Sequence, residues 1–155
     1  MVIDLMMYNG ERDILNILLS IFAPYVDKFI ICEAKTTFSG NPKPLYFFRD
    51  QRYFSQFWRK IDHYVLPETY TPEEYELALS SPNTQGASHW KREFLQKEAM
   101  KGALTKLADD DIVFIGDVDE IVNPLVSFDS ETPIKAKLDV YTYYLNNRSS
   151  EQFHG

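Results

Sequence analysis

The feature that most constrains the fold is a strand, a helix and a second strand in immediate succession at the start of the chain. Val2–Tyr8 is a short apolar run that ends at Asn9-Gly10, a dipeptide typical of turns. Val26–Glu33 contains a continuous Phe-Ile-Ile-Cys run, typical of a strand covered on both faces. The segment between them ends at Pro24 and carries apolar residues at helical spacing: Ile14, Ile17, Leu18, Ile21 and Phe22. This order predicts a βαβ unit, and therefore an α/β fold with a mostly parallel sheet flanked by helices.

The rest of the chain continues the same alternation. A turn-rich loop at residues 36–44 follows the second strand, where α/β proteins place ligand-binding loops. Five further elements are expected: a short aromatic helix at Phe48–Trp58, strands at Ile61–Leu66 and Ile112–Ile115 (the latter buried in the sheet), a long helix at Ser88–Leu107 and a last strand at Leu138–Leu145. Residues 1–155 are the length of a single domain.

Charge and cysteine content exclude several classes of protein. The 16 Lys and Arg residues against 23 Asp and Glu residues leave a net charge of −7, so nucleic acid, which needs clustered cations, is not expected as a partner. The single cysteine, Cys32, cannot form an intramolecular disulfide and suits a reducing compartment. The first residues lack the pattern of a secretion signal, and no apolar stretch reaches the ~20 residues that span a membrane. These features predict a cytoplasmic protein.

Two carboxylates directly after the apolar run Ile112–Ile115 are the sharpest candidates for chemistry. Asp117 and Asp119 are two residues apart, so on an extended chain they point to the same side. Carboxylate oxygens at the open end of a strand suit Mg²⁺ or Mn²⁺ bridging a diphosphate, and such an ion can neutralise a departing nucleoside diphosphate. Asp109 and Asp111 repeat the spacing but precede the strand, where an acidic turn is the simpler interpretation.

The run DDDIVFIGDVDEIVNP, at residues 109–124, resembles the signature of glycosyltransferase family 17, the family of the bisecting β-1,4-mannosyl-glycoprotein N-acetylglucosaminyltransferases. Three further segments are similar to parts of that family and occur in the same order: residues 9–19, 26–47 and 92–104. The resemblance implies a GT-A-like, inverting, metal-dependent enzyme that transfers a sugar from a UDP-sugar, UDP-GlcNAc, to a hydroxyl of a glycan or glycoconjugate.

The resemblance also implies roles for particular residues. Asp117 and Asp119 would hold a Mn²⁺ or Mg²⁺ ion and the diphosphate, and Glu33 would lie where enzymes of this type bind uridine. Arg92 and Lys97 would face the phosphates. Lys97 stands where the family is expected to have Arg, which keeps the charge but loses the bidentate geometry of a guanidinium.

Glu120, beside the metal-binding pair, is the nearest candidate for the general base that deprotonates the acceptor. Catalytic domains of the family run beyond the length of this chain, so the resemblance further implies that residues 1–155 form an incomplete nucleotide-sugar-binding domain. Without an acceptor-side wall we expect poor catalysis and marginal stability.

Two other functions fit parts of the sequence. A haloacid-dehalogenase-like phosphatase also has an apolar run followed by two spaced aspartates, with Asp117 as nucleophile and Asp119 as acid, but needs a distal lysine and acidic pair. A truncated, non-catalytic relic or interaction module would keep half of the nucleotide site. Structural interpretations also stay open for single residues: Glu33 as a solvated strand-end carboxylate, and Arg92 and Lys97 as the wet face of a helix.

Overall fold

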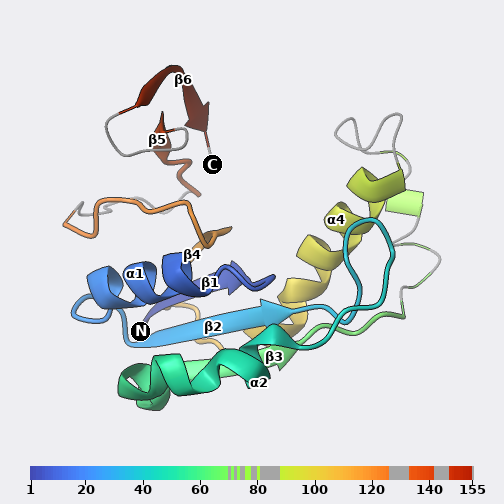
Figure 1. Ribbon diagram of the computed structural model, residues 1–155, viewed down its shortest axis with the longest axis horizontal. Coiled ribbons are helices and arrows are strands. Elements are labelled where there is room, and N and C mark those ends of the chain that lie inside the picture. The colour runs from blue at the N-terminus through green and yellow to red at the C-terminus, as the bar shows by residue number, and fades with distance from the viewer. Residues whose placement is uncertain are drawn as a thin grey trace.

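The computed structural model describes residues 1–69, 71, 73, 76, 77, 80, 88–125, 133–141 and 147–154, with only the backbone for 88, 89 and 151–154. Within them the chain forms a four-stranded parallel sheet with the strand order β3-β2-β1-β4 (Figure 1). The strands are β1 (Val2–Met7), β2 (Lys28–Glu33), β3 (Ile61–Val65) and β4 (Ile112–Asp117). The helical segments are α1 (Arg12–Phe22), α2 (Tyr46–Asp50), η1 (Gln51–Lys60), α4 (Ser88–Ala99) and η3 (Met100–Leu104). The predicted α/β class with a parallel sheet is confirmed.

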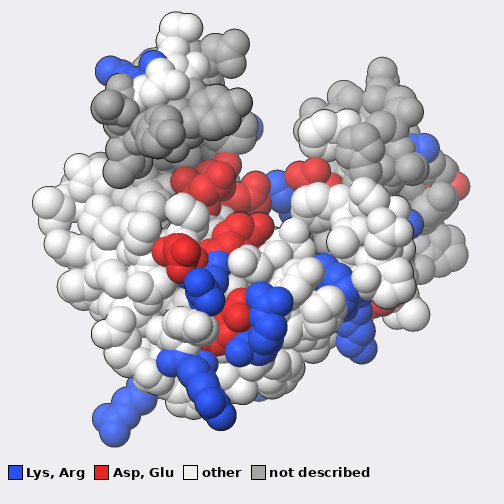
Figure 2. All heavy atoms as spheres, in the orientation of Figure 1, with Lys and Arg blue, Asp and Glu red and all other residues white. Residues whose placement is uncertain are grey.

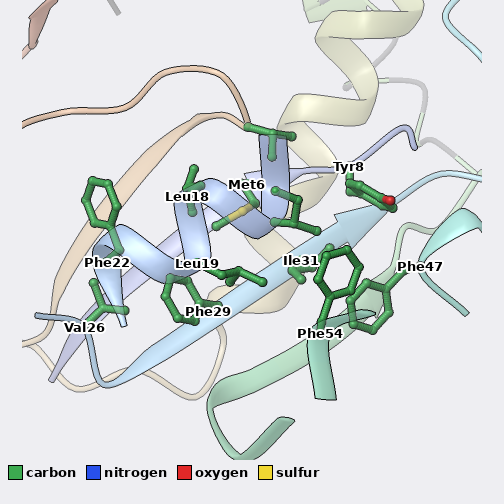
Figure 3. Close-up of a cluster of buried hydrophobic side chains, with 12 residues drawn as sticks. Met6, Tyr8, Leu18, Leu19, Phe22, Val26, Phe29, Ile31, Phe47 and Phe54 are labelled. Atoms are coloured by element: carbon green, nitrogen blue, oxygen red, sulfur yellow. The ribbon is translucent and has the colours of Figure 1, made fainter. Parts of the chain in front are cut away.

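Helical segments cover both faces of the sheet because successive strand residues point to opposite sides. On one face, Met6 and Ile31 pack with side chains from α1, α2 and η1, as Figure 3 shows. Phe47 of α2 and Phe54 of η1 are stacked there, with ring centroids 5.7 Å apart. On the other face, a second cluster joins β1 and β2 to Met100 and its neighbours in η3. The two clusters fix the sheet as the middle layer of three.

The buried face of α1 differs from the predicted one. Leu15, Leu18, Leu19 and Phe22 are buried, whereas three isoleucines of the predicted stripe are between 37% and 47% exposed (Ile14, Ile17 and Ile21). Both sets recur at helical spacing, so the sequence pattern alone does not decide which one faces the sheet.

β4 is not the buried, central strand that its apolar run predicted. It pairs with β1 at one end of the described sheet, and its residues Ile112 and Ile115 are 46% and 66% exposed. An unbroken apolar run is typical of a parallel strand but does not specify how many neighbours that strand has.

The expected last strand, Leu138–Leu145, is also corrected. Its first part forms β5 (Lys137–Tyr141), which pairs antiparallel with β6 (Arg148–His154) in a separate two-stranded sheet (Figure 1). Residues 142–145 of the expected strand lie outside the described residues. In the described part of the chain, no helix is long and apolar enough to cross a membrane.

Candidate active site

The parallel pairing brings the carboxyl ends of three strands to one edge of the sheet. Met7, the last residue of β1, is level with Cys32 of β2 on one side and with Asp117 of β4 on the other. Glu33 follows Cys32 at the end of β2. Open α/β sheets bind ligands outside the carboxyl ends of their strands, so this edge is where the predicted site residues gather.

A tight turn holds Asp117 at the end of β4. The backbone N–H of Asp117 donates to Oε2 of Glu120 at 3.0 Å, and the N–H of Glu120 donates back to the carbonyl oxygen of Asp117 at 3.0 Å. Gly116 permits this, since a Cβ at that position would lie 2.9 Å from Oε2 of Glu120. One carboxylate oxygen of Glu120 therefore holds the turn that positions Asp117.

Asp119 lies in this turn rather than on the strand, so the alternation expected for an extended chain ends at Asp117. Val118 is 4% exposed and packs into the core, while Asp119 is exposed and the Asp117 side chain is 45% exposed. The argument from strand alternation was wrong for Asp119. Both carboxylates are nevertheless open to solvent on either side of an anchored valine.

Helix α4 brings a cation to Asp117. Nζ of Lys97 lies 3.3 Å from Oδ2 of Asp117 and 3.2 Å from Oε1 of Glu93, one helical turn earlier. Burial lowers the pKa of Lys97, but its attraction to Asp117 and its hydrogen bond with Glu93 outweigh burial and raise that pKa above the ordinary value. Lys97 thus keeps its charge at the rim of the site. Figure 2 shows acidic side chains gathered in the hollow on this edge, with basic side chains beside them.

Arg92 and Gln96, on the same helix, contact the loop after β2 instead. Gln96 is 2% exposed and donates from Nε2 to the carbonyl oxygen of Thr36 at 3.1 Å. Nε of Arg92 is buried and has no hydrogen-bond partner among the described residues. Its guanidinium lies against Gly40, where an added Cβ would be 2.9 Å from Nη2. No sequence pattern pointed to Gln96, because an isolated glutamine on a helix is usually exposed.

Glu33 is fully buried, so its carboxylate is not exposed to solvent at the end of the strand. Nζ of Lys43 donates to Oε1 at 3.2 Å, and Nε2 of His63 lies 3.2 Å from Oε2. The backbone N–H groups of Tyr46 and Phe47, in the first turn of α2, also donate to it. The expectation of a solvated carboxylate is wrong, and sequence analysis missed His63 because a lone histidine in a strand has no metal-ligand spacing.

These contacts keep Glu33 ionised. Burial by itself would raise the pKa of Glu33, but hydrogen bonds from His63, Phe47 and Tyr46 and the charge of Lys43 outweigh it, so the pKa lies below the ordinary value. Because its oxygens are engaged, Glu33 supports this edge of the sheet through the groups that it holds, the loop lysine Lys43 and the start of α2.

Comparison with family models decides the assignment. The model for glycosyltransferase family 17 matches residues 1–128. The chain belongs to glycosyltransferase family 17. Comparisons with curated proteins and with solved structures gave no match. Family 17 membership supports glycosyl transfer over the phosphatase alternative, and the three-layer arrangement around a parallel sheet is the α/β, Rossmann-like fold expected of such a glycosyltransferase.

Proposed function

We propose that this family 17 chain binds UDP-GlcNAc at the carboxyl edge of its sheet and transfers the sugar, with inversion, to a hydroxyl of a glycan or glycoconjugate. The observation that carries the proposal is the pair formed by Asp117 and Lys97, 3.3 Å apart at the end of β4. It places an accessible carboxylate and a persistent cation together where α/β proteins bind ligands. A diphosphate needs such local help, because a chain with a net charge of −7 repels it.

The donor set suits a Mg²⁺ or Mn²⁺ ion that arrives with the nucleotide. Asp117 and Asp119 offer accessible carboxylates, but among the described residues no group of three or more His, Cys, Asp or Glu side chains could hold a metal. Mg²⁺ sites of this kind use one or two carboxylates and complete their shell with substrate phosphates. When bound, the ion supplies charge neutralisation for the departing UDP.

The other residues of the site position groups around this donor. Glu120 holds the turn at Asp117 through a backbone hydrogen bond, and Lys97 supplies positive charge beside the diphosphate. Nε of Arg92 is buried at the loop after β2 and has no hydrogen-bond partner among the described residues, which suits contact with a second anionic group. In the transfer, a carboxylate takes the proton of the acceptor hydroxyl, whose oxygen attacks the anomeric carbon from the face opposite UDP. The bond from that carbon to the phosphate oxygen breaks, and UDP leaves with the electron pair. The assignment of Glu120 as that base stays a prediction.

Calorimetric titration of UDP tests the proposal. We expect UDP to bind in the presence of Mn²⁺ and much more weakly in EDTA. Asp119→Ala should weaken binding with Mn²⁺ at least ten-fold, about 1.4 kcal/mol. Asp109→Ala is the matched control, because Asp109 is exposed and its removal changes the net charge equally. Asp111 is unsuitable, since it accepts a hydrogen bond from the N–H of Ala108 at 2.8 Å.

Equal UDP affinity with Mn²⁺ and in EDTA would contradict the role of the metal. Equal behaviour of the Asp119 and Asp109 variants would contradict the assignment of the motif. Release of GlcNAc from UDP-GlcNAc, followed by chromatography, tests the donor sugar, and its absence together with tight UDP binding would favour the non-catalytic alternative.

A further inference from the structure

A buried carboxylate in the middle of β1 has no role in the site described above. Asp4 pairs in register with Phe29 of β2 and Phe114 of β4, and is 7% exposed. Within the described part of the chain its side chain makes no hydrogen bond or ion pair. A buried charge without a partner is unfavourable, so an ionised Asp4 lowers the stability of the fold.

The Asp4 side chain lines a cavity of about 540 Å³. The cavity lies between α1, β4 and the segment that leads into β5. Its walls are mainly apolar and include Leu18 and Phe22 of α1 together with Ile134 and Leu138. Both its size and its apolar lining are those of sites for small organic groups, which typically measure ~300–1,000 Å³.

The charged residues that line this cavity in the described part of the chain are all acidic. Asp111 and Asp117 of the β4 region and Glu120 of the following turn line it with Asp4, and no Lys or Arg side chain of the described residues does. Burial raises the pKa of Asp4 to about 7. Asp117 and Asp111 already pair with Lys97 and with the N-terminal amine, so Asp4 is the buried acid that lacks a partner among the described residues. An anion would be repelled by Asp4, and an uncharged apolar molecule would leave it unpaired. A cation removes both penalties.

We propose that this cavity binds an organic cation, an ammonium or guanidinium group on an apolar stem, with the charged end paired to Asp4 and the stem against the α1 and β4 walls. The same chemistry is available from a free amine and from a lysine or arginine side chain of a polypeptide. A charge-assisted pair with Asp4 gives the cavity its specificity, and the apolar walls give it affinity.

The first test titrates the full chain with hexylammonium and hexylguanidinium, with hexanol and hexanoate as uncharged and anionic controls. We expect binding of the two cations, and at least ten-fold weaker binding of hexanol and hexanoate. Asp4→Asn should weaken cation binding at least ten-fold. Asp110→Asn, an exposed residue outside the cavity, should change it less than two-fold. A short apolar peptide with one lysine separates the two sources, since tighter binding than hexylammonium favours a polypeptide.

A second readout uses the wild-type chain and does not depend on the variant. The ¹³C signal of the Asp4 carboxyl group reports its protonation, and saturating hexylammonium should lower its pKa by at least one unit. Equal affinity for hexanol and hexylammonium, an unchanged Asp4 signal, or no binding at millimolar concentration would each overturn the proposal. Neither test contains UDP or metal. Because Asp117 and Glu120 also line the cavity, the Asp4→Asn variant and the Asp4 signal, rather than binding alone, distinguish this site from the proposed donor site.

Discussion

Replacing Asp4 with asparagine should stabilise the protein at neutral and alkaline pH. Burial raises the pKa of Asp4 from 3.8 to about 7 in the folded state. Between these values the folded chain holds a proton that the unfolded chain has released, so stability falls as pH rises. About three pH units at ~1.4 kcal/mol each amount to about 4 kcal/mol of stability lost by pH 8. Asparagine cannot ionise, so the variant does not lose this stability. The gain is reduced by the cost of burying the asparagine amide.

Urea unfolding of wild type and Asp4→Asn, followed by circular dichroism at pH 3.5, 5, 6.5 and 8, measures this effect. The difference in free energy of unfolding should be small at pH 3.5, grow through the intermediate values and reach up to about 4 kcal/mol at pH 8. Asp110→Asn, whose carboxylate is exposed, should follow the wild type throughout. A pH-independent difference, or a wild type that is more stable than Asp4→Asn at pH 8, would refute the reasoning.

Two other substitutions test the supports of the active-site edge. Glu33→Gln should lower the free energy of unfolding by about 1–3 kcal/mol at pH 7, because it removes the charge that pairs with Lys43 and His63. Folding lowers the pKa of Glu33, so the stability that wild type has over Glu33→Gln is present above pH 4.5 and is lost as the pH falls below it. Urea titrations of both proteins at pH 3 and pH 7 measure this. An equal difference in the free energy of unfolding at the two pH values would contradict the proposed role of the Glu33 charge. Gly40→Ala should lower the free energy of unfolding by about 1 kcal/mol or more in the same assay, because Gly40 has φ +87° and an added Cβ would contact Arg92. An unchanged urea midpoint would show instead that the loop relaxes to accommodate the Cβ.

The sequence predicted the elements that local patterns determine. β1, β2 and β3 lie where the apolar runs placed them, and the loop after β2 reaches the ligand-binding edge. Lys97 and Asp117 are 20 residues apart in sequence, and the family resemblance, rather than any spacing rule, brought them into one predicted site.

What could not be predicted depends on contacts between distant segments. The edge position of β4 follows from which strand it pairs with, and an apolar run carries no information on that. The burial of Asp4 could not be predicted for the same reason. A single acidic residue in a strand is normally expected to face solvent. The pairing of Lys137–Tyr141 with Arg148–His154 in a separate sheet depends on which segment lies beside that strand, and the residue pattern of the strand does not specify this.

The cluster around Glu33 has a consequence for the order of folding. α2 has five residues and no side-chain cap of its own, and the N–H groups of its first turn donate to a carboxylate from β2. Such a short helix does not persist alone in water. We therefore expect α2 to form only after β2 and β3 have paired and brought Glu33 and His63 together. The helix that covers this part of the sheet would then form late in folding, on strands that are already paired.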